Sequence, residues 1–291
     1  FFRLVRRLRL TSSTIVAFGS TRRASVSPAR DPNLKALLNA ETQTITIFGK
    51  SWDLHVRDVL KISLDDNLKV IEDSVRFLTR HGRAVIYDAE HFFDGFAANR
   101  AYALKTLRVA QEAGASAIVF CDTNGGRLPA EITDAIKVSK APLRVPLGIH
   151  AHNDSDLGVA NSLAAVIAGC RQVQGTINGY GERCGNADLV SLTAILTVKM
   201  GYRCLPAHKL KELTEVSRFV AEVSNMIPRP NQPFVGSTAF AHKGGVHVNA
   251  VMKNPQTYEH LDPGRIGNQR KILVSELSGR SAIVLKAKDL A

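Results

Sequence analysis

The stretch SAIVFCDT, residues 116–123, decides the fold class, because an apolar run here ends in a polar cluster and a helical pattern follows. Apolar runs without polar alternation are typical of strands that are buried on both faces. The same pattern recurs in TIVAFGST (14–21), TITIFGKS (44–51), RAVIYDAE (83–90), VPLGIHAH (145–152) and RQVQGTIN (171–178). Candidate helices lie between the runs, at 67–81, 99–114, 129–139 and 155–169. This alternation of strands and helices predicts a parallel sheet.

The polar residues always follow the carboxyl end of a run, which is where a (β/α)8 barrel carries its chemistry. An open doubly wound sheet would place its ligand near one switch point only, so the ring is favoured. Six runs are present where a barrel has eight strands. We therefore expect an α/β fold in which a TIM-type barrel, residues 1–202, lacks about its first two strands. Residues 203–291 lack the alternation of apolar runs and helical patterns, and we expect them to form a small, mostly helical annex.

Composition excludes several classes of protein. The net charge is +12, but seven of the excess charges are arginines within the first thirty residues, and no nucleic-acid-binding motif accompanies them. No apolar run reaches the roughly 18 residues that a membrane helix needs. The four cysteines follow no disulfide or zinc spacing, which favours reduced thiols in the cytoplasm. The basic start, FFRLVRRLRL, fits the end of a barrel helix better than a transit peptide, since a strand-like run follows at once.

The stretch GIHAHNDSDLG, residues 148–158, carries the strongest chemical signal. Residues two apart on a strand point to the same side, so His150 and His152 can bind one metal ion. Imidazole suits zinc, manganese and related metals, and a catalytic site needs further ligands and an open position. The ordinary alternative is a pair of histidines satisfied by hydrogen bonds at a strand end.

Neighbouring clusters strengthen the metal hypothesis. Asn186, in NGYGERCGNADL (178–189), supplies a neutral oxygen ligand, although it could also cap a helix. Asp88 and Glu90, in YDAEHFFDG (87–95), share one face of a strand end and suit acid–base transfer or helix capping. Thr123, in CDTNGG (121–126), offers a hydroxyl donor for a substrate carboxylate, although Asn-Gly by itself predicts a turn. HKGGVH (242–247) lies outside the barrel rhythm and by itself is most simply a structural loop.

Taken together, HAHND, GTINGYGERCGN and AFAHKGGVH resemble the acetyl-CoA-dependent 2-oxoacid condensing enzymes and their hydroxymethylglutaryl-CoA lyase relatives. FGSTRRA, FGKSWDLHV, YDAEHFFDGF, CDTNGG and VSELSGRS are most similar to the citramalate synthase branch. The resemblance covers essentially the whole chain. It implies a transferase of amino-acid (isoleucine) biosynthesis that condenses acetyl-CoA with pyruvate.

The resemblance also implies roles for individual residues. A divalent metal (manganese, magnesium, zinc or cobalt) is bound by His150, His152 and Asn186, together with an aspartate of an Asp-Arg-Glu signature that this sequence does not contain. Glu90 assists acid–base chemistry, and Asp88 and Thr123 hold the substrate. His247, with His242 as the second choice, and Tyr258 come from the annex, which in the family reaches into the partner subunit's site. A homodimer with small-molecule substrates, and without nucleic acid or membrane, is therefore expected.

Some alternatives stay open at this stage. Pyruvate could be replaced by the substrate of 2-isopropylmalate or homocitrate synthase. Because the aspartate and its neighbouring arginine are absent from the sequence, these 291 residues alone are expected to be inactive. Asp156 stands where a small residue is usual, and it either caps the following helix or crowds the site.

Overall fold

Six parallel strands form the centre of the protein, in the order β1 to β6, which is also their order in the sequence. The computed structural model describes residues 1–8 and 10–273, so the VSELSGRS stretch lies outside the described residues. The strands span Val16–Ser20 (β1), Thr44–Lys50 (β2), Ala84–Glu90 (β3), Ala117–Asp122 (β4), Leu147–Ala151 (β5) and Gln172–Gln174 (β6). Each of the six predicted runs thus contains one strand, and all neighbouring strands are parallel.

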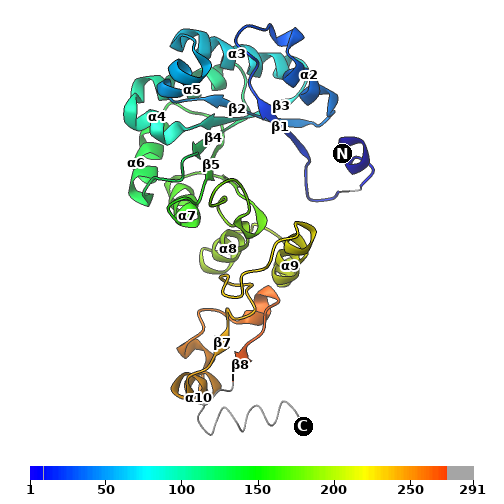
Figure 1. Ribbon diagram of the computed structural model, residues 1–291, viewed down its shortest axis with the longest axis vertical. Helices are drawn as coiled ribbons and strands as arrows, with labels where there is room; N and C mark the ends of the chain where they lie inside the picture. Colours follow the sequence, from blue (N-terminus) through cyan, green and yellow to red (C-terminus); the bar gives the residue numbers. More distant parts are fainter. Residues whose placement is uncertain (9, 274–291) are drawn as a thin grey trace. The chain divides into compact units, whose positions relative to one another are not determined.

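Helices connect the strands and cover the outer side of the curled sheet (Figure 1). They span Pro32–Asn39 (α2), Leu64–Arg80 (α3), Phe92–Ala98 (α4), Arg100–Glu112 (α5), Pro129–Ser139 (α6) and Gly158–Ala168 (α7), whereas the short helix α1 (Phe2–Val5) precedes the first strand. Local signals explain several starts: the side chains of Asp31, Ser63 and Asn99 accept backbone N–H groups at the first turns of α2, α3 and α5. The four predicted helices correspond to α3, α5, α6 and α7.

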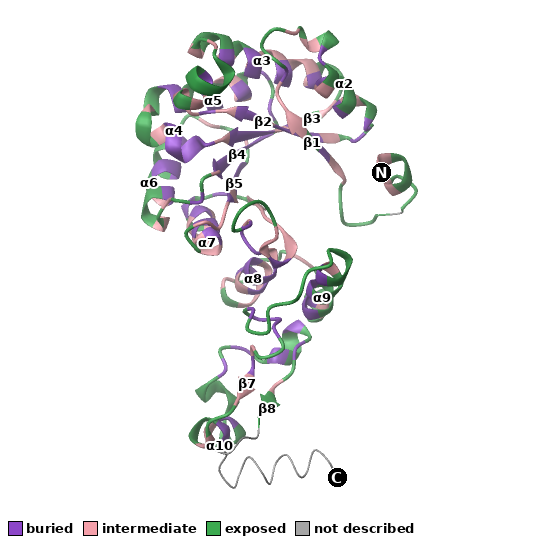
Figure 2. Cartoon of the chain, viewed as in Figure 1, coloured by how far each residue is buried: buried purple, intermediate pink, exposed green. Residues whose placement is uncertain are grey.

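The two faces of the sheet differ in chemistry. Side chains such as Ile45, Tyr87, Ile118, Phe120 and Ile149 are fully buried and form one core with the helices. Figure 2 shows buried residues concentrated on the strands and on the sides of the helices that face them. Burying each such side chain stabilises the fold by about 1.5–3 kcal/mol. The alternate residues point to the concave face, which therefore carries the polar groups described below.

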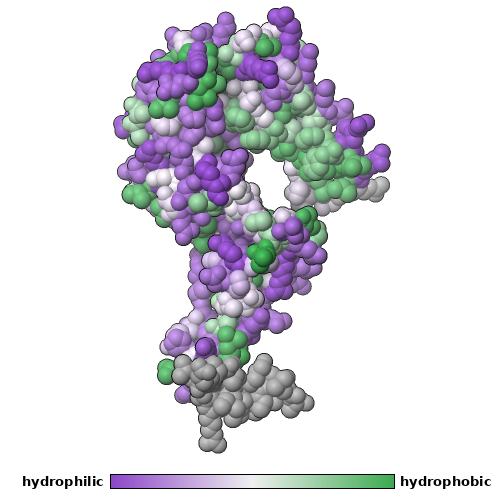
Figure 3. Space-filling view, viewed as in Figure 1, coloured by the Kyte–Doolittle hydropathy of each residue, from purple (hydrophilic) through white to green (hydrophobic). Residues whose placement is uncertain are grey.

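Contacts divide the chain into two units. Unit 1 comprises residues 1–175 and 181–187, and unit 2 comprises residues 176–180 and 188–291. This division differs from the domain boundary at residue 202, which stays a prediction. Figure 3 shows hydrophobic surface at the start of unit 1, where Phe1, Leu4 and Leu8 are exposed. Among the described residues, no helix is both long and apolar enough to cross a membrane.

Unit 2 is mostly helical, as expected of the annex. It contains the helices α8 (Leu189–Ala194), α9 (Leu213–Val223) and α10 (Gly245–Lys253). Short irregular helices lie at Ile177–Gly179, Ile195–Lys199, Ala207–Glu212, Pro255–Thr257 and Pro263–Ile266. Two short strands, β7 (Ala241–His242) and β8 (Lys271–Ile272), pair in parallel. A second apolar cluster, which includes Leu213, Phe240 and Ile266, forms its core.

Candidate metal and substrate site

His150 and His152 lie at the carboxyl end of β5, and their Nε2 atoms are 3.3 Å apart. Two nitrogens bound to one tetrahedral zinc at about 2.0–2.1 Å would be separated by about 3.3 Å. Burial lowers the pKa of His150, and burial together with the nearby His150 ring lowers the pKa of His152 to about 4. Both rings are therefore neutral at physiological pH, which is the form that binds metals. The spacing and the protonation fit a shared cation.

Backbone pairing brings Asn186 to the same place. His152 and Asn186 form an isolated antiparallel bridge, and the Ala187 N–H donates to the carbonyl of Ala151. The Asn186 side chain forms a hydrogen bond to His150. Asn186 is not the cap of α8, because that position belongs to Asp188, whose side chain accepts the Val190 N–H. The predicted three-residue set thus converges at one point of unit 1.

Gly181 makes room for the Asn186 amide. A Cβ atom at position 181 would overlap Nδ2 of Asn186 and would lie 3.1 Å from its Cγ. Any side chain at this position would therefore displace the amide from the histidines.

The donor set is two imidazoles and one amide. Among the described residues, no group of three or more His, Cys, Asp or Glu side chains could hold a metal ion. This finding agrees with the absence of the Asp-Arg-Glu signature from the sequence. The three side chains leave coordination positions for further oxygen ligands, which suits a catalytic rather than a structural metal.

Gln174 connects His150 to Asp88, and sequence reasoning did not single it out. Its Oε1 lies 2.9 Å from Nδ1 of His150, and its Nε2 lies 3.0 Å from Oδ1 of Asp88. Burial raises the pKa of Asp88 to about 7, while the hydrogen bond from Gln174 works in the opposite direction. The signal available in the sequence was a pair of glutamines, Gln172 and Gln174, two apart on an otherwise apolar run.

Glu90 is held by an ion pair with Lys50. The Lys50 Nζ atom lies 2.6 Å from a carboxylate oxygen of Glu90, and the two residues are directly opposite in the β2–β3 register. Both side chains are about one-fifth exposed, so the pair is accessible from the concave face. Neither Glu90 nor Asp88 caps a helix, because the residue before α4 is His91.

Thr123 is positioned by His91. Its Oγ1 accepts the backbone N–H of His91 at 2.8 Å, which leaves the hydroxyl proton available for donation. His91 has a positive φ of 55°, and its ring Nδ1 lies 3.3 Å from Asp94. Asp94 also accepts from Arg127 at 2.7 Å, and these contacts lower the pKa of its carboxyl. This network was not predictable from the sequence, because its members come from two separate segments, 91–94 and 123–127.

Arg183 links the loops at the carboxyl ends of the strands of unit 1. Its guanidinium forms two hydrogen bonds to the Asp154 carboxylate, at 2.7 and 3.0 Å, and a third to the Thr123 carbonyl. The hydrogen bonds from Arg183 lower the pKa of Asp154. This clamp joins the loops that follow β4, β5 and β6 around the candidate site.

Asp156 does not cap α7. The helix starts at Gly158, whose N–H donates to Oδ1 of Asn153 at 3.0 Å. Asp156 instead has a φ of 58°, and its carboxylate accepts from the Asn153 amide. Left-handed backbone favours glycine, and aspartate is one of the few other residues that tolerate it. Of the two alternatives for Asp156, capping of the following helix is therefore excluded.

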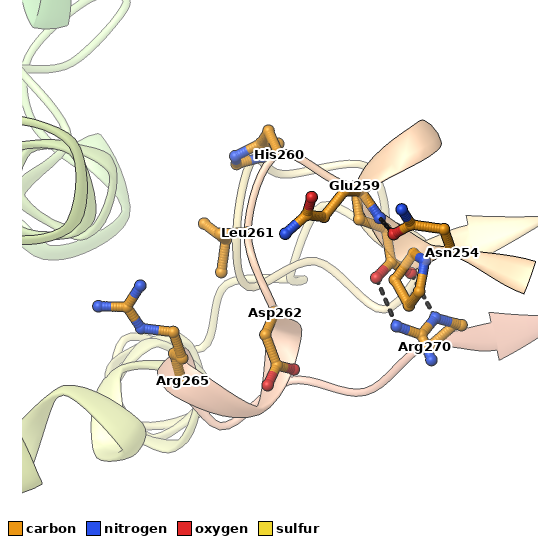
Figure 4. A pocket seen from close by; sticks show the side chains of 9 residues that line it. Asn254, Glu259, His260, Leu261, Asp262, Arg265 and Arg270 are labelled. Atoms are coloured by element: carbon orange, nitrogen blue, oxygen red, sulfur yellow. Dashed lines mark hydrogen bonds and ion pairs between the residues drawn. The ribbon is translucent and has the colours of Figure 1, made fainter.

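His247 and Tyr258 both lie in unit 2, where their rings stack with centroids 4.1 Å apart. His242, the second choice, is engaged elsewhere: its Nε2 lies 3.2 Å from Glu259. Glu259 also accepts two hydrogen bonds of 2.6 Å from Arg270, which lower the pKa of its carboxyl. This ion pair lines a pocket of about 840 Å³ that Asn254, His260, Leu261, Asp262 and Arg265 complete (Figure 4).

The sequence is similar to two described domain families. A family model described as HMGL-like matches residues 11–220, and one described as homocitrate synthase post-HMGL domain-like matches residues 234–291. The chain is 53% identical over 289 residues to the (R)-citramalate synthase of Geobacter sulfurreducens, which covers 99% of this chain and 55% of the relative. It is also 53% identical over 291 residues to the (R)-citramalate synthase of Aquifex aeolicus, with 99% and 55% covered. The chain thus spans about half the length of these curated relatives.

A solved structure supports the fold. The HMG-CoA lyase of Bacillus subtilis superimposes with a TM-score of 0.64 and 16% identity, over 79% of this chain and 77% of that one. This likeness and the curled parallel sheet confirm the predicted barrel-type fold. With a family model matched over residues 11–220, the chain belongs to the HMGL-like family.

Proposed function

We propose that the protein containing this chain condenses acetyl-CoA with pyruvate to give citramalate, in a metal-assisted reaction. The observation that carries the proposal is the pair of neutral imidazoles whose Nε2 atoms lie 3.3 Å apart, beside Asn186. Glu90 and Thr123 lie at the carboxyl ends of the neighbouring strands β3 and β4, at the same edge of the sheet. The 53% identity to two proteins named (R)-citramalate synthase supports the substrate assignment.

His150, His152 and Asn186 would hold a divalent metal, for which manganese, magnesium, zinc and cobalt are the candidates. When bound, such an ion supplies Lewis-acid polarisation of a ketone oxygen. The two rings are neutral in the folded chain, so binding requires no prior loss of a ring proton at physiological pH.

The remaining residues would bind and orient the substrates. The Thr123 hydroxyl, whose oxygen already accepts from His91, would donate to the pyruvate carboxylate. Glu90 would exchange a proton with the reacting groups, and its pairing with Lys50 fixes its position. Arg183 would stabilise the loops that enclose them through its bonds to Asp154 and the Thr123 carbonyl.

The stacked pair of His247 and Tyr258 would contribute from unit 2. Tyr258 is 46% exposed, so part of its surface is accessible to a ligand or to a second subunit. On this basis we propose a homodimer in which these two residues take part in catalysis. The four cysteines are free thiols, which supports a cytoplasmic location.

A thiol-release assay tests the proposal. Liberation of CoA from acetyl-CoA is followed with the purified full-length protein that contains this chain, with and without each metal, against a panel of pyruvate, 2-oxoisovalerate and 2-oxoglutarate. We expect release that needs both a divalent metal and pyruvate. A preference for 2-oxoisovalerate or 2-oxoglutarate would instead assign the protein to the 2-isopropylmalate or homocitrate synthases, and metal-independent release would contradict the site itself.

A further inference from the structure

Gln174 lies where it can control how the proton is placed on the His150 ring. The β5–β6 register puts these residues directly opposite each other, and their side chains meet at 2.9 Å on the concave face. The NH₂ end of the same amide lies 3.0 Å from Asp88, which is on β3, two strands beyond the β5 strand of His150. One amide therefore links a buried carboxylate to a candidate metal ligand.

In the structure the NH₂ group of Gln174 donates to Asp88 and the amide oxygen faces His150. When Asp88 is ionised this orientation is required, because an ionised carboxylate can only accept. The reverse orientation would then place the amide oxygen against a carboxylate oxygen, with no proton between them. Because the amide oxygen can only accept, Nδ1 of His150 must carry the ring proton.

This arrangement leaves the Nε2 lone pair of His150 directed toward Nε2 of His152, 3.3 Å away. The opposite tautomer would place a proton on Nε2, in the space where a cation would bind. A hydrogen bond to the distal ring nitrogen commonly fixes the tautomer of a metal-binding histidine and raises its basicity.

We infer that Gln174 and Asp88 are positioning residues that together select the Nδ1–H tautomer of His150. The inference builds on the proposed metal site, but the tautomer itself is a property of the metal-free chain and can be measured there. Asp88 is 3% exposed, and one of its oxygens is already engaged by Gln174, which supports a positioning role over the predicted contact with substrate.

Three variants separate the contributions of the two Gln174 hydrogen bonds. Gln174→Leu removes both hydrogen bonds, Gln174→Glu keeps an acceptor for His150, and Asp88→Asn removes the group that orients the amide. Gln172→Leu is the matched control, because Gln172 lies on the same strand and face but stands opposite Gly148. Circular dichroism and thermal unfolding confirm that each variant folds.

The primary readout is the tautomer of His150 in metal-free protein, from long-range ¹⁵N–¹H correlation spectra of histidine-labelled samples, with His150→Gln for assignment. We expect the Nδ1–H form in the natural sequence, the control and Gln174→Glu. A shift toward Nε2–H is expected in Gln174→Leu and, to a smaller extent, in Asp88→Asn.

The second readout is Zn²⁺ affinity by isothermal titration. Gln174→Leu should weaken binding by about tenfold to hundredfold, and Gln172→Leu by less than about threefold. An Nε2–H tautomer in the natural sequence, or a tautomer that Gln174→Leu leaves unchanged, would overturn the inference. If the tautomer responds as expected while the natural sequence binds no metal, the proposed function fails and the positioning role stands.

Discussion

Replacing Gly181 by alanine should damage the metal site while leaving the fold intact. The new Cβ atom would overlap Nδ2 of Asn186 and press on its Cγ. The Asn186 backbone cannot retreat, because it is bridged to His152 and the next N–H is bonded to Ala151. The side chain must therefore rotate away from His150.

The expected magnitude follows from which atoms collide. Because the overlapped atoms belong to a side chain that can turn, the loss of unfolding free energy should stay below about 1 kcal/mol. Losing the correct placement of one ligand should weaken metal binding by at least the roughly tenfold to hundredfold seen when a supporting partner is removed, or about 1.4–2.7 kcal/mol.

The assay is isothermal titration with Zn²⁺, together with chemical denaturation of the metal-free protein. Gly126→Ala is the control, since a Cβ atom there meets nothing within 4 Å. In a double-mutant cycle, Gly181→Ala should add little to the effect of Asn186→Ala, because both act through one amide. Equal affinities for Gly181→Ala and Gly126→Ala, or fully additive losses in the cycle, would show that Gly181 does not act through the Asn186 amide.

Three further predictions concern stability and pH. The folded pKa of His152, about 4, lies below the ordinary value of 6.5, so only the unfolded chain gains a proton between these values. The free energy of unfolding should therefore fall by up to about 3 kcal/mol as the pH drops from 6.5 to 4. His152→Gln should flatten this dependence in denaturant titrations, and an unchanged slope would exclude the assigned pKa. Asp156→Gly should raise stability by roughly 0.5–1 kcal/mol, because glycine suits a φ of 58°; a loss measured by thermal unfolding would contradict the strain. Asn153→Ala should cost about 1 kcal/mol through the lost hydrogen bond from the Gly158 N–H at the start of α7, and a neutral result would show that this bond does not stabilise the protein.

The sequence predicted β2 to β5 well because these strands are apolar runs whose residues are mostly buried. β6 is a weaker case, since it is short and half-buried and carries Gln172 and Gln174. It also predicted the positions of His150, His152 and Asn186, since residues at the carboxyl ends of neighbouring parallel strands must lie at one edge of the sheet. The spacing of His150 and His152 predicted their common face, and their ring nitrogens do approach each other.

What the sequence could not show depends on pairing between distant segments. Gln174 faces His150 only because β6 pairs with β5 in one register, and it reaches Asp88 only because the sheet curls. The contact of Arg183 with Asp154 joins two loops separated by a strand and a helix. The sequence left the role of Asp156 open because a helix cap depends on backbone conformation, which the residue type alone does not set.

The metal site can be tested by a crystal structure of the protein with Mn²⁺, located by anomalous scattering. We expect one ion within bonding distance of Nε2 of both His150 and His152 and of the side-chain oxygen of Asn186. An ion bound elsewhere, with both Nε2 atoms free of metal, would contradict the proposed site.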